Sequence, residues 1–559
     1  MAEALPAAIT VTPEQAVLMF PALTAAQLAR VVAHGRLRPL VDGDTLVEPG
    51  VMPAQFFVLC SGRIQILRQT PRGEQLVVTH GPGAFTGEAN GLLGRPPMTR
   101  VRVVEAGEAV ELSRAELLTL IQTDTEIGDV MMRAYLYRRA QLIDQGLGDV
   151  IVLGSAHCAG TLRVKEFLIR NGHPFTYVDL DHDRDGESLL DLFQVSSADV
   201  PVVVCRGTTI LRKPGNDEIA GCLGFNAGVD RGHVRDVVVV GGGPAGLAAA
   251  VYGASEGLDV LVVESNVPGG QAGSSSRIEN YLGFPLGISG RELTDNALMQ
   301  AKKFGAEVLV AKGAVSLHCG ERPYAVQLDE GVPIPARTVI LATGAEYRHP
   351  PIENLSRFQN AGVYYSATPM EAQLCGGEEV VVVGGANSAG QAAVFLSAAA
   401  RRVHLLVRGA GLSSTMSRYL IRRIDDSTHI ELHVLTEIVS LEGGAHLERV
   451  VWRDQQTSRT ETRDIRHVFM MTGAVPNTGW VRGCLALDDK GFVKTGTALS
   501  AAELEAARWP RTRLPHVLET TLPGVFAVGD VRSGSMKRVA SAVGEGSTAI
   551  SLVHQTLAE

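Results

Sequence analysis

The sequence contains no Cys-x-x-Cys pair, although its 559 residues include seven cysteines. They are scattered along the chain, at Cys60, Cys158, Cys205, Cys222, Cys319, Cys375 and Cys484. This scatter argues against a zinc site and a disulfide framework, and it is typical of proteins from a reducing compartment. The chain opens without a basic segment that leads into an apolar core, so we expect no signal peptide and a cytoplasmic location.

The chain also has no excess of positive charge. Aspartate and glutamate outnumber lysine and arginine, and the formal net charge is −9. No basic field would attract nucleic acid, so we expect no nucleic-acid partner. One uncharged run, Val237–Ser255, is long enough to raise the alternative of a membrane helix. Its glycines and Pro244 fall where a nucleotide-binding turn needs them, and we therefore expect no membrane partner.

The length predicts about three or four domains of roughly 150 residues each. The first is expected over residues 1–148. Between Leu37 and Leu112, short β-like runs alternate with turn residues, which is the pattern of a small jelly-roll-like barrel. A helical segment, Pro13–His34, precedes this pattern, and one helix over Leu117–Gln145 is predicted to follow it.

Within this domain, GAFTGE (residues 83–88) followed by GLLGRP (residues 91–96) resembles the phosphate-binding cassette of cyclic-nucleotide-binding domains. The resemblance implies that Glu88 binds the ribose and that an arginine neutralises the cyclic phosphate. The place of that arginine falls on Pro97, which offers no charge or donor, and Arg95 and Arg100 lie nearby. The domain therefore either binds a cyclic nucleotide effector or is a degenerate module for dimerisation or partner contact.

Residues 149–231 are expected to form an α/β domain. Asp149–Leu153 predicts a strand, Thr161–Asn171 a helix and Phe175–Asp181 a second strand, and after a further helix Pro201 opens a third strand. This order resembles a glutaredoxin-like thioredoxin fold, which implies that the proline is cis and faces a redox cysteine. Cys158 stands before the first helix, where the helix dipole favours a thiolate, but no second thiol follows three residues later. Cys158 is either a single active thiol or an inert cysteine in a docking domain.

Residues Asp236–Glu264 carry the most informative pattern of the chain. A strand leads into a glycine turn, an alanine-rich helix and a second strand that ends in an acid. Gly241 allows the tight turn, Gly243 lets backbone N–H groups approach a pyrophosphate, and Gly246 lets the helix pack against the strand. Glu264 is placed to accept hydrogen bonds from a ribose. The pattern predicts a dinucleotide-binding βαβ unit rather than a glycine-rich turn of an unrelated domain.

Further motifs follow in order: GGQA at 269–272, IENYLGFP at 278–285, ATGA at 342–345 and GVFAVGDV at 524–531. With the βαβ unit they resemble the low-molecular-weight thioredoxin reductase family of FAD-dependent pyridine-nucleotide oxidoreductases. The resemblance implies an FAD domain over residues 235–350 and 476–559, and a homodimer. The residues it places at FAD are Gly241, Gly243, Gly246, Glu264, Gly270, Gln271, Asn280, Thr343, Gly344, Gly529 and Asp530.

Residues 351–475 are then expected to form an NAD(P)H domain, which starts on a second βαβ pattern at Val380–Gly390. Ala386 takes the second glycine position, where a methyl group crowds a pyrophosphate. The family's arginine-rich stretch for a 2′-phosphate is reduced to Arg408, with further arginines from Arg418 onward. Because a 2′-phosphate prefers a guanidinium, we expect NADPH, with NADH as the alternative. The residues expected to hold the coenzyme are Gly384, Asn387, Ser388 and Arg408.

The redox motif departs from that family. Where the family carries Cys-Ala-Thr-Cys, the chain has Ser366, Ala367, Thr368 and Pro369. Serine and proline cannot form a disulfide, so the usual relay from flavin to a dithiol is excluded at this position. Cys375 lies nearby but is single, and it is expected to be a packed cysteine rather than a redox group.

The sequence thus predicts a multidomain fold with a β jelly-roll-like barrel and helices, a thioredoxin-like α/β domain and two Rossmann-like α/β domains. We expect an FAD-dependent NAD(P)H oxidoreductase that passes electrons to a small redox protein or a small-molecule acceptor, and we expect no metal site. Two alternatives stay open. One is a thioredoxin-disulfide reductase variant that uses Cys158, and the other is a non-catalytic flavin or nucleotide sensor regulated through the N-terminal domain.

Overall fold

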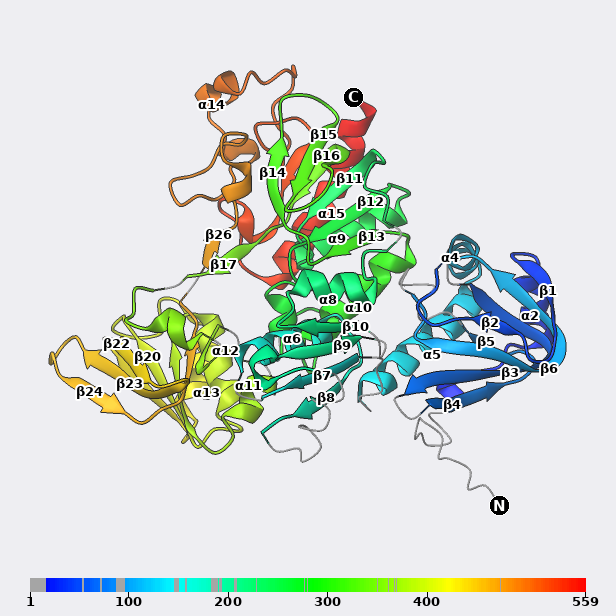
Figure 1. Cartoon of the computed structure of the whole chain (residues 1–559). Helices are drawn as coiled ribbons and strands as arrows, with labels where there is room; N and C mark the ends of the chain where they lie inside the picture. Colours follow the sequence, from blue (N-terminus) through cyan, green and yellow to red (C-terminus); the bar gives the residue numbers. More distant parts are fainter. Residues whose placement is uncertain are drawn as a thin grey trace.

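A computed structural model gives the architecture of the chain (Figure 1). It describes residues 17–52, 55–70, 73–86, 96–144, 150–155, 158–181, 190, 194–205, 209–227, 229–275, 277–278, 280–348, 350–359, 361–365, 367, 369–472 and 474–559. An N-terminal domain and a second domain are followed by two sheet domains, named here the β11 domain and the β19 domain after a central strand of each. None of the described helices combines the length and the apolar character needed to cross a membrane.

The N-terminal domain is a β domain with helices on its core, as predicted. Its sheet has the order β1-β6-β3-β4, with β2 paired to β6 and β5 to β3. Apolar residues of β3, β5 and β6 pack against α2 and the helices that follow the sheet. The elements are α2 (Ala25–Val32), β1 (Arg36–Leu40), β2 (Thr45–Val47), β3 (Phe56–Thr70), β4 (Gly73–His80), β5 (Phe85–Thr86), β6 (Thr99–Leu112), α4 (Arg114–Thr123) and α5 (Thr125–Asp144).

The single helix predicted over Leu117–Gln145 is wrong, because the segment forms two helices that meet at Asp124. Asp124 adopts an extended backbone, and its carboxylate accepts a hydrogen bond from the Ile127 N–H at 3.1 Å. The same carboxylate pairs with Arg30 of α2 at 2.6 Å. Asp124 therefore ends α4 and caps α5, a role that aspartate takes more readily than an interior helical position.

The second domain has a mixed sheet of order β10-β9-β7-β8. β7 and β8 are parallel, while β9 is antiparallel to both of its neighbours. The predicted strands and first helix are confirmed, whereas most of the segment of the second predicted helix lies outside the described residues. The elements are β7 (Val150–Gly154), α6 (Ala159–Arg170), β8 (Thr176–Asp179), η1 (Ser197–Asp199), β9 (Val202–Cys205), β10 (Thr209–Arg212) and α8 (Asn216–Leu223).

The β11 domain is built on a sheet of order β13-β12-β11-β16-β15-β14, with β27 paired to β16. β13, β12, β11, β16 and β27 are parallel, and helices α9, α10 and α15 cover them. The elements are β11 (Arg235–Val240), α9 (Pro244–Ser255), β12 (Val260–Glu264), η2 (Ala272–Ser274), α10 (Gly290–Lys303), β13 (Glu307–Val310), β14 (Ala314–His318), β15 (Tyr324–Leu328), β16 (Ile334–Leu341), η4 (Gly479–Val481), η5 (Gly496–Ala498), α14 (Ala501–Ala506), β27 (Val525–Ala527), η6 (Gly529–Val531) and α15 (Val539–Ala558).

The β19 domain is inserted into the β11 domain through two short antiparallel strands, β17 (Ala345–Tyr347) and β26 (Ala474–Pro476). A parallel sheet of order β18-β25-β19-β20-β21 faces an antiparallel sheet of order β22-β23-β24 across a shared core. The elements are η3 (Leu355–Phe358), β18 (Val363–Tyr364), α11 (Pro369–Leu374), β19 (Glu379–Val383), α12 (Asn387–Leu396), β20 (Arg402–Val407), α13 (Arg418–Asp425), β21 (Ile430–Val434), β22 (Thr436–Gly443), β23 (Leu447–Asp454), β24 (Thr460–Arg463) and β25 (His467–Met470).

The second domain and the β11 domain share one hydrophobic core. Phe167 and Phe225 of the second domain are buried in the same cluster as Leu247 and Val262 of the β11 domain. In Figure 1 the second domain accordingly lies against the β11 domain, between the N-terminal domain and the β19 domain. Removing apolar surface from water at this junction stabilises both units together.

Candidate nucleotide and redox site

The glycine turn after β11 has the geometry that a dinucleotide-binding turn requires. Gly241 has φ +108°, and a Cβ atom there would lie 2.3 Å from the Ala342 carbonyl oxygen. At Gly246 an added Cβ would lie 1.9 Å from the Gly241 oxygen, because α9 packs closely on the turn. A Cβ on Gly243, by contrast, would meet only the Gly270 Cα, at 3.9 Å. The space over Gly243 therefore lies at the N-terminus of α9, where a pyrophosphate would be stabilised.

Glu264 ends β12 beside this turn and is buried. Its carboxylate accepts hydrogen bonds from the Gly242 N–H at 2.7 Å and from the Asn266 N–H at 2.8 Å. Burial raises the pKa of Glu264, and these two donors oppose the shift. Glu264 thus fixes the turn, and a carboxylate has further lone pairs with which to accept a ribose hydroxyl.

The carboxyl ends of four parallel strands meet at this edge of the sheet. Val240 is in register with Val263 and with Leu341, and Leu341 is in register with Ala527. The turns that follow these strands therefore lie together, which is where open α/β sheets bind ligands. They carry the predicted positions Gly241, Glu264, Thr343, Gly344, Gly529 and Asp530.

Two of these turns are fixed by the protein itself. The Thr343 hydroxyl donates to the Asn477 carbonyl at 2.8 Å, and the Gly529 N–H donates to the Glu545 carboxylate at 2.6 Å. Burial raises the pKa of Asp530, against the opposing charge of Lys537. The edge of the sheet is therefore held in place by these hydrogen bonds.

The loop that contains Gly270 and Gln271 closes over the glycine turn. Gly269 N–H donates to the Gly242 carbonyl at 2.7 Å, and the Gln271 amide donates to the Ala345 carbonyl. Asn280, farther along the chain, is exposed. The structure thus brings Gly270 and Gln271 to the turn, while the place of Asn280 in a site stays a prediction.

Arg170 is a site residue that the sequence analysis missed. It lies at the end of α6 in the second domain, and its guanidinium donates to the Gly270 carbonyl at 2.7 Å. Its charge also opposes the rise that burial causes in the pKa of Glu264. The second domain therefore places a positive charge beside the glycine turn, where it can attract an anion. No local pattern signals this contact, because it joins residues about a hundred positions apart.

The β19 domain repeats the turn geometry at its own sheet edge. Gly384 has φ +146°, and a Cβ atom there would lie 2.4 Å from the Met471 carbonyl oxygen. Ala386 is the N-cap of α12, and Ser388 is exposed on its first turn. Asn387 accepts a hydrogen bond from the Ser417 N–H at 2.8 Å.

Arg408 directly follows β20 and is exposed at the same sheet edge. Val383 of β19 is in register with Leu406 of β20, so the turn after Val383 and the residues after Val407 lie side by side. The structure therefore places Arg408 near the Gly384 turn, as recognition of a 2′-phosphate would require.

Cys375, the cysteine near the expected redox motif, is inaccessible to solvent. Cys375 is completely buried after α11, and burial raises its pKa to about 11. Ala367 is also buried, and Pro369 begins α11. Ser366 and Thr368 lie outside the described residues. Cys375 is therefore a protonated, packed cysteine at neutral pH, as predicted.

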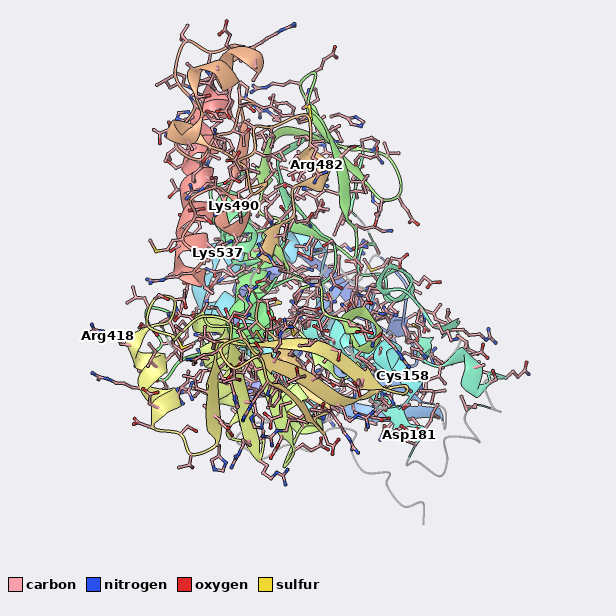
Figure 2. All side chains as sticks on the ribbon, turned by 90° about the vertical axis from the view of Figure 1, so that its left-hand side faces the viewer. Cys158, Asp181, Arg418, Arg482, Lys490 and Lys537 are labelled. Atoms are coloured by element: carbon pink, nitrogen blue, oxygen red, sulfur yellow. A yellow bond between two sulfur atoms is a disulfide. The ribbon has the colours of Figure 1, made fainter. Side chains whose placement is uncertain are left out.

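Cys158 occupies a different environment, as the N-cap of α6 in the second domain (Figure 2). A Cβ atom added at Gly160 would lie 3.7 Å from the Cys158 sulfur and 2.9 Å from Pro201 Cδ. The Val200–Pro201 peptide bond is cis, as the resemblance implied. The structure thus brings Cys158 and Pro201 together at the first turn of α6.

A pocket of 240 Å³ separates the second domain from the start of the β19 domain. It is adjacent to α11, the helix that Pro369 opens. Its walls come from three of the four domains: Leu162, Arg163, Glu166, Asn216, Asn266, Tyr364, Glu371 and Leu374.

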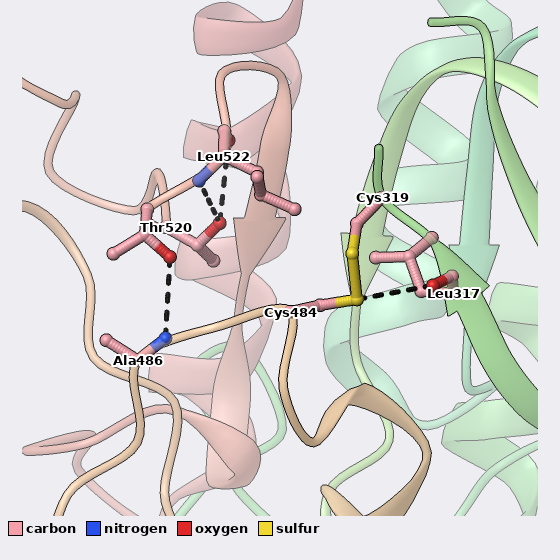
Figure 3. The surroundings of a disulfide bond; sticks show 7 residues. Leu317, Cys319, Cys484, Ala486, Thr520 and Leu522 are labelled. Atoms are coloured by element: carbon pink, nitrogen blue, oxygen red, sulfur yellow. Dashed lines mark hydrogen bonds between the residues drawn. A yellow bond between two sulfur atoms is a disulfide. The ribbon is translucent and has the colours of Figure 1, made fainter. Parts of the chain in front are cut away.

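Cys319 and Cys484 form a disulfide, which the scattered cysteine spacing argued against (Figure 3). The two residues are 165 positions apart, and their Cα atoms are 6.1 Å apart. The bond joins the end of β14 to the segment after η4, on the far side of the β11 sheet from the second domain. Scattered spacing in the sequence does not reveal such a long-range pair.

In the N-terminal domain, Glu88 and Arg95 of the predicted effector site lie outside the described residues. Arg100 is described, and its guanidinium pairs with Glu48 at 2.8 Å and with Glu74. These carboxylates compete with any phosphate for Arg100.

Comparison with known proteins agrees with this geometry. Residues 235–546 match the pyridine nucleotide-disulphide oxidoreductase family, and residues 37–124 match the cyclic nucleotide-binding domain family. A thioredoxin reductase from Mycolicibacterium smegmatis is 33% identical over 332 residues, which are 58% of this chain and 97% of the relative. The NADPH-dependent thioredoxin reductase 3 of Arabidopsis thaliana is 31% identical over 56% of each chain.

Among solved structures, the thioredoxin reductase of Lactococcus lactis matches with a TM-score of 0.52 and 25% identity, over 58% of this chain and 99% of the other. The thioredoxin reductase of T. acidophilum matches with a TM-score of 0.52 and 26% identity, over 59% of this chain and 100% of the other. Both similarities concern the part of the chain that contains the β11 and β19 domains.

Proposed function

Because the chain belongs to the pyridine nucleotide-disulphide oxidoreductase family, we propose that it oxidises NAD(P)H at FAD and passes the electrons to an external acceptor without an internal cysteine pair. The turn at Gly241, the open space over Gly243 and the acid Glu264 fit the pyrophosphate and ribose of FAD. Bound FAD would supply the hydride chemistry, while the protein supplies orientation and electrostatics.

The observation that carries the proposal is the absence of a usable thiol where the family keeps its redox pair. Ser366 and Pro369 occupy the two cysteine positions. Cys375 is six residues beyond Pro369, but it is fully buried and its pKa is raised to about 11. A buried thiol of this kind supplies little thiolate, so it does not replace the missing pair.

The β19 domain supports the coenzyme part of the proposal. The Gly384 turn and the N-terminus of α12 would hold the pyrophosphate, and Arg408 would favour the 2′-phosphate of NADPH. Ala386, the N-cap of α12, stands where the dinucleotide motif has a glycine, and its methyl group would weaken the binding of either coenzyme. We therefore propose NADPH as the preferred coenzyme.

Anaerobic mixing of the flavoprotein with NADPH and with NADH tests this function. We expect NADPH to bleach the visible flavin band faster than NADH does, and a protein acceptor or a quinone to restore it. The panel of acceptors is ferredoxin, thioredoxin, a quinone and oxygen. A flavin that neither coenzyme reduces would contradict the proposal.

A second candidate is disulfide reduction through Cys158. This is favoured by its place beside cis-Pro201 at the N-terminus of α6, in a domain whose strand order supports a thioredoxin-like fold. If Cys158 transfers electrons, Cys158→Ser abolishes thioredoxin reduction and leaves quinone reduction unchanged. If Cys158→Ser retains thioredoxin reduction, this candidate is wrong.

We also propose that the N-terminal domain regulates the enzyme. The core of that domain includes Met299 of α10, and Gln122 of α4 donates to the Lys303 carbonyl at 2.9 Å. Thr294, earlier in α10, packs closely against Gly269 in the loop over the glycine turn. A Cβ atom added at Gly269 would lie 2.7 Å from the Thr294 hydroxyl oxygen. Helix α10 thus contacts both the N-terminal domain and the nucleotide loop, and titration with cyclic AMP and cyclic GMP tests whether a cyclic nucleotide is the effector.

A further inference from the structure

A cluster of imidazole and carboxylate groups lies between the two sheets of the β19 domain. His404 on β20 is in register with Glu431 on β21, and His433 is two residues beyond Glu431. Residues in register on parallel strands, and residues two apart on one strand, project from the same face of a sheet. All three side chains are therefore on the face that covers Trp452 of β23.

The ligand atoms of these side chains converge. His404 Nδ1 is 3.0 Å from His433 Nε2. Oε2 of Glu431 lies 3.7 Å from His404 Nδ1, and Oε1 of Glu431 lies 3.5 Å from His433 Nε2. Two atoms that each lie about 2.1 Å from a zinc ion are about 3.0 to 3.7 Å apart when the angle at the metal is about 90° to 125°. These spacings fit two imidazole nitrogens and one carboxylate group around one metal ion.

We propose that His404, Glu431 and His433 bind a divalent transition-metal ion of the zinc class. Neutral imidazole and carboxylate are ligands that such ions accept, and this combination is found in zinc sites. Among the residues that the structure describes, this is the set of histidine, cysteine and acidic side chains with ligand atoms close enough to share an ion. The site cannot be predicted from sequence spacing, since the ligands come from two strands without a metal-binding motif.

The surroundings of His404 favour the tautomer that a metal needs. His404 is 1% exposed, and its Nε2 lies 3.4 Å from a carboxylate oxygen of Glu379 on β19. A proton on Nε2 leaves the Nδ1 lone pair free to face the ion, and a carboxylate behind a ligating histidine holds the ring in that state. Glu379 is thus a positioning residue.

Solvent can complete the coordination. The side chain of Glu431 is 44% exposed and that of His433 is 18% exposed, so water can reach the ion from the same side. Arg402 also pairs with Glu431, at 3.1 Å. A carboxylate has lone pairs enough for both an arginine and a metal.

The alternative is a hydrogen bond between the two imidazoles with no metal. Titration of the chelator-treated, full-length flavoprotein with Zn²⁺ by calorimetry separates the two. We expect the wild type to bind Zn²⁺ at one class of sites. His433→Gln and Glu431→Gln should each lower the Zn²⁺ affinity roughly tenfold or more, and Glu379→Gln should lower it about tenfold. His429→Gln is the matched control, because His429 is an exposed histidine next to β21 and should bind Zn²⁺ like the wild type.

The indole of Trp452 provides a second measurement that needs no ligand variant. Its ring centre lies 5.4 Å from that of His404 and 5.5 Å from that of His433. Ni²⁺ bound at the site should quench the fluorescence of Trp452, which is the part of the emission that is lost in Trp452→Phe. Zn²⁺ should compete with Ni²⁺ and so reduce the quenching. Equal Zn²⁺ binding by wild type, His433→Gln and Glu431→Gln, or no quenching that depends on Trp452, would overturn the proposal.

Discussion

At the scale of single residues, the glycines of the β11 turn have different tasks. Gly243→Ala adds a methyl group that meets no protein atom closer than 3.9 Å, so the fold should persist. The methyl group would occupy the space proposed for the pyrophosphate, and we expect FAD affinity to fall about tenfold or more, about 1.4 kcal/mol. Equilibrium dialysis of FAD measures this, and unchanged affinity would contradict the placement of the cofactor.

Two further glycine substitutions serve as comparisons for Gly243→Ala. Gly241→Ala should reduce the stability of the fold itself by roughly 1–3 kcal/mol, because φ is +108° and the Cβ would clash with Ala342. Gly544→Ala, in an exposed position of α15 with nothing within 4 Å of the added Cβ, should stabilise by about 0.5–1 kcal/mol. The order of the three thermal midpoints separates clash, cofactor crowding and helix propensity.

His80 gives the N-terminal domain a pH dependence. Burial lowers its pKa to about 3, with a contribution from the charge of Arg138, whereas an unfolded histidine has a pKa of about 6.5. Between these values the unfolded state binds a proton that the folded state does not. The free energy of unfolding therefore falls as pH decreases through this window, by up to about 1.4 kcal/mol per pH unit. His80→Gln should flatten the slope of the domain's thermal midpoint against pH, and equal slopes would show that another group is responsible.

At the scale of elements, the Cys319–Cys484 disulfide joins β14 to the segment after η4. A cross-link between positions 165 residues apart restricts the unfolded chain, so reduction should destabilise the β11 domain by about 2–4 kcal/mol. Thiol titration of the denatured protein before and after reduction, with thermal unfolding of both forms, measures the bond and its effect. Cys222→Ser, which alters a cysteine outside the disulfide, is the control. Detection of all the cysteines as thiols without a reductant would contradict the bond.

Some of these elements could be predicted from the sequence, whereas others could not. The β11–α9–β12 unit follows from its spacing, because the turn glycines, Pro244 and Glu264 stand at characteristic intervals within one continuous segment. The break at Asp124 was missed because a helical pattern continues on both sides of it. Contacts such as Arg170 with Gly270 depend on how two domains pack, which periodicity and spacing do not encode.

At the scale of the whole molecule, we propose that the second domain contributes to the nucleotide site. Arg170 donates to the Gly270 carbonyl across the shared core, and its charge would favour the phosphates of FAD. Arg170→Met should weaken FAD binding roughly tenfold, since a charged hydrogen bond contributes about 1.5–3 kcal/mol. Arg212→Met, on the exposed strand β10, is the matched control. If both variants retain FAD equally, the second domain is a neighbour of the site and not a component of it.

We propose that electrons enter at the flavin and leave without an internal dithiol. Anaerobic titration with NADPH counts the electrons that the protein can store, because a disulfide in contact with the flavin takes a second equivalent of reductant. We predict that a single molar equivalent of NADPH per FAD bleaches the flavin completely and that no thiols appear. Uptake of a second equivalent, with the appearance of two thiols, would contradict the account.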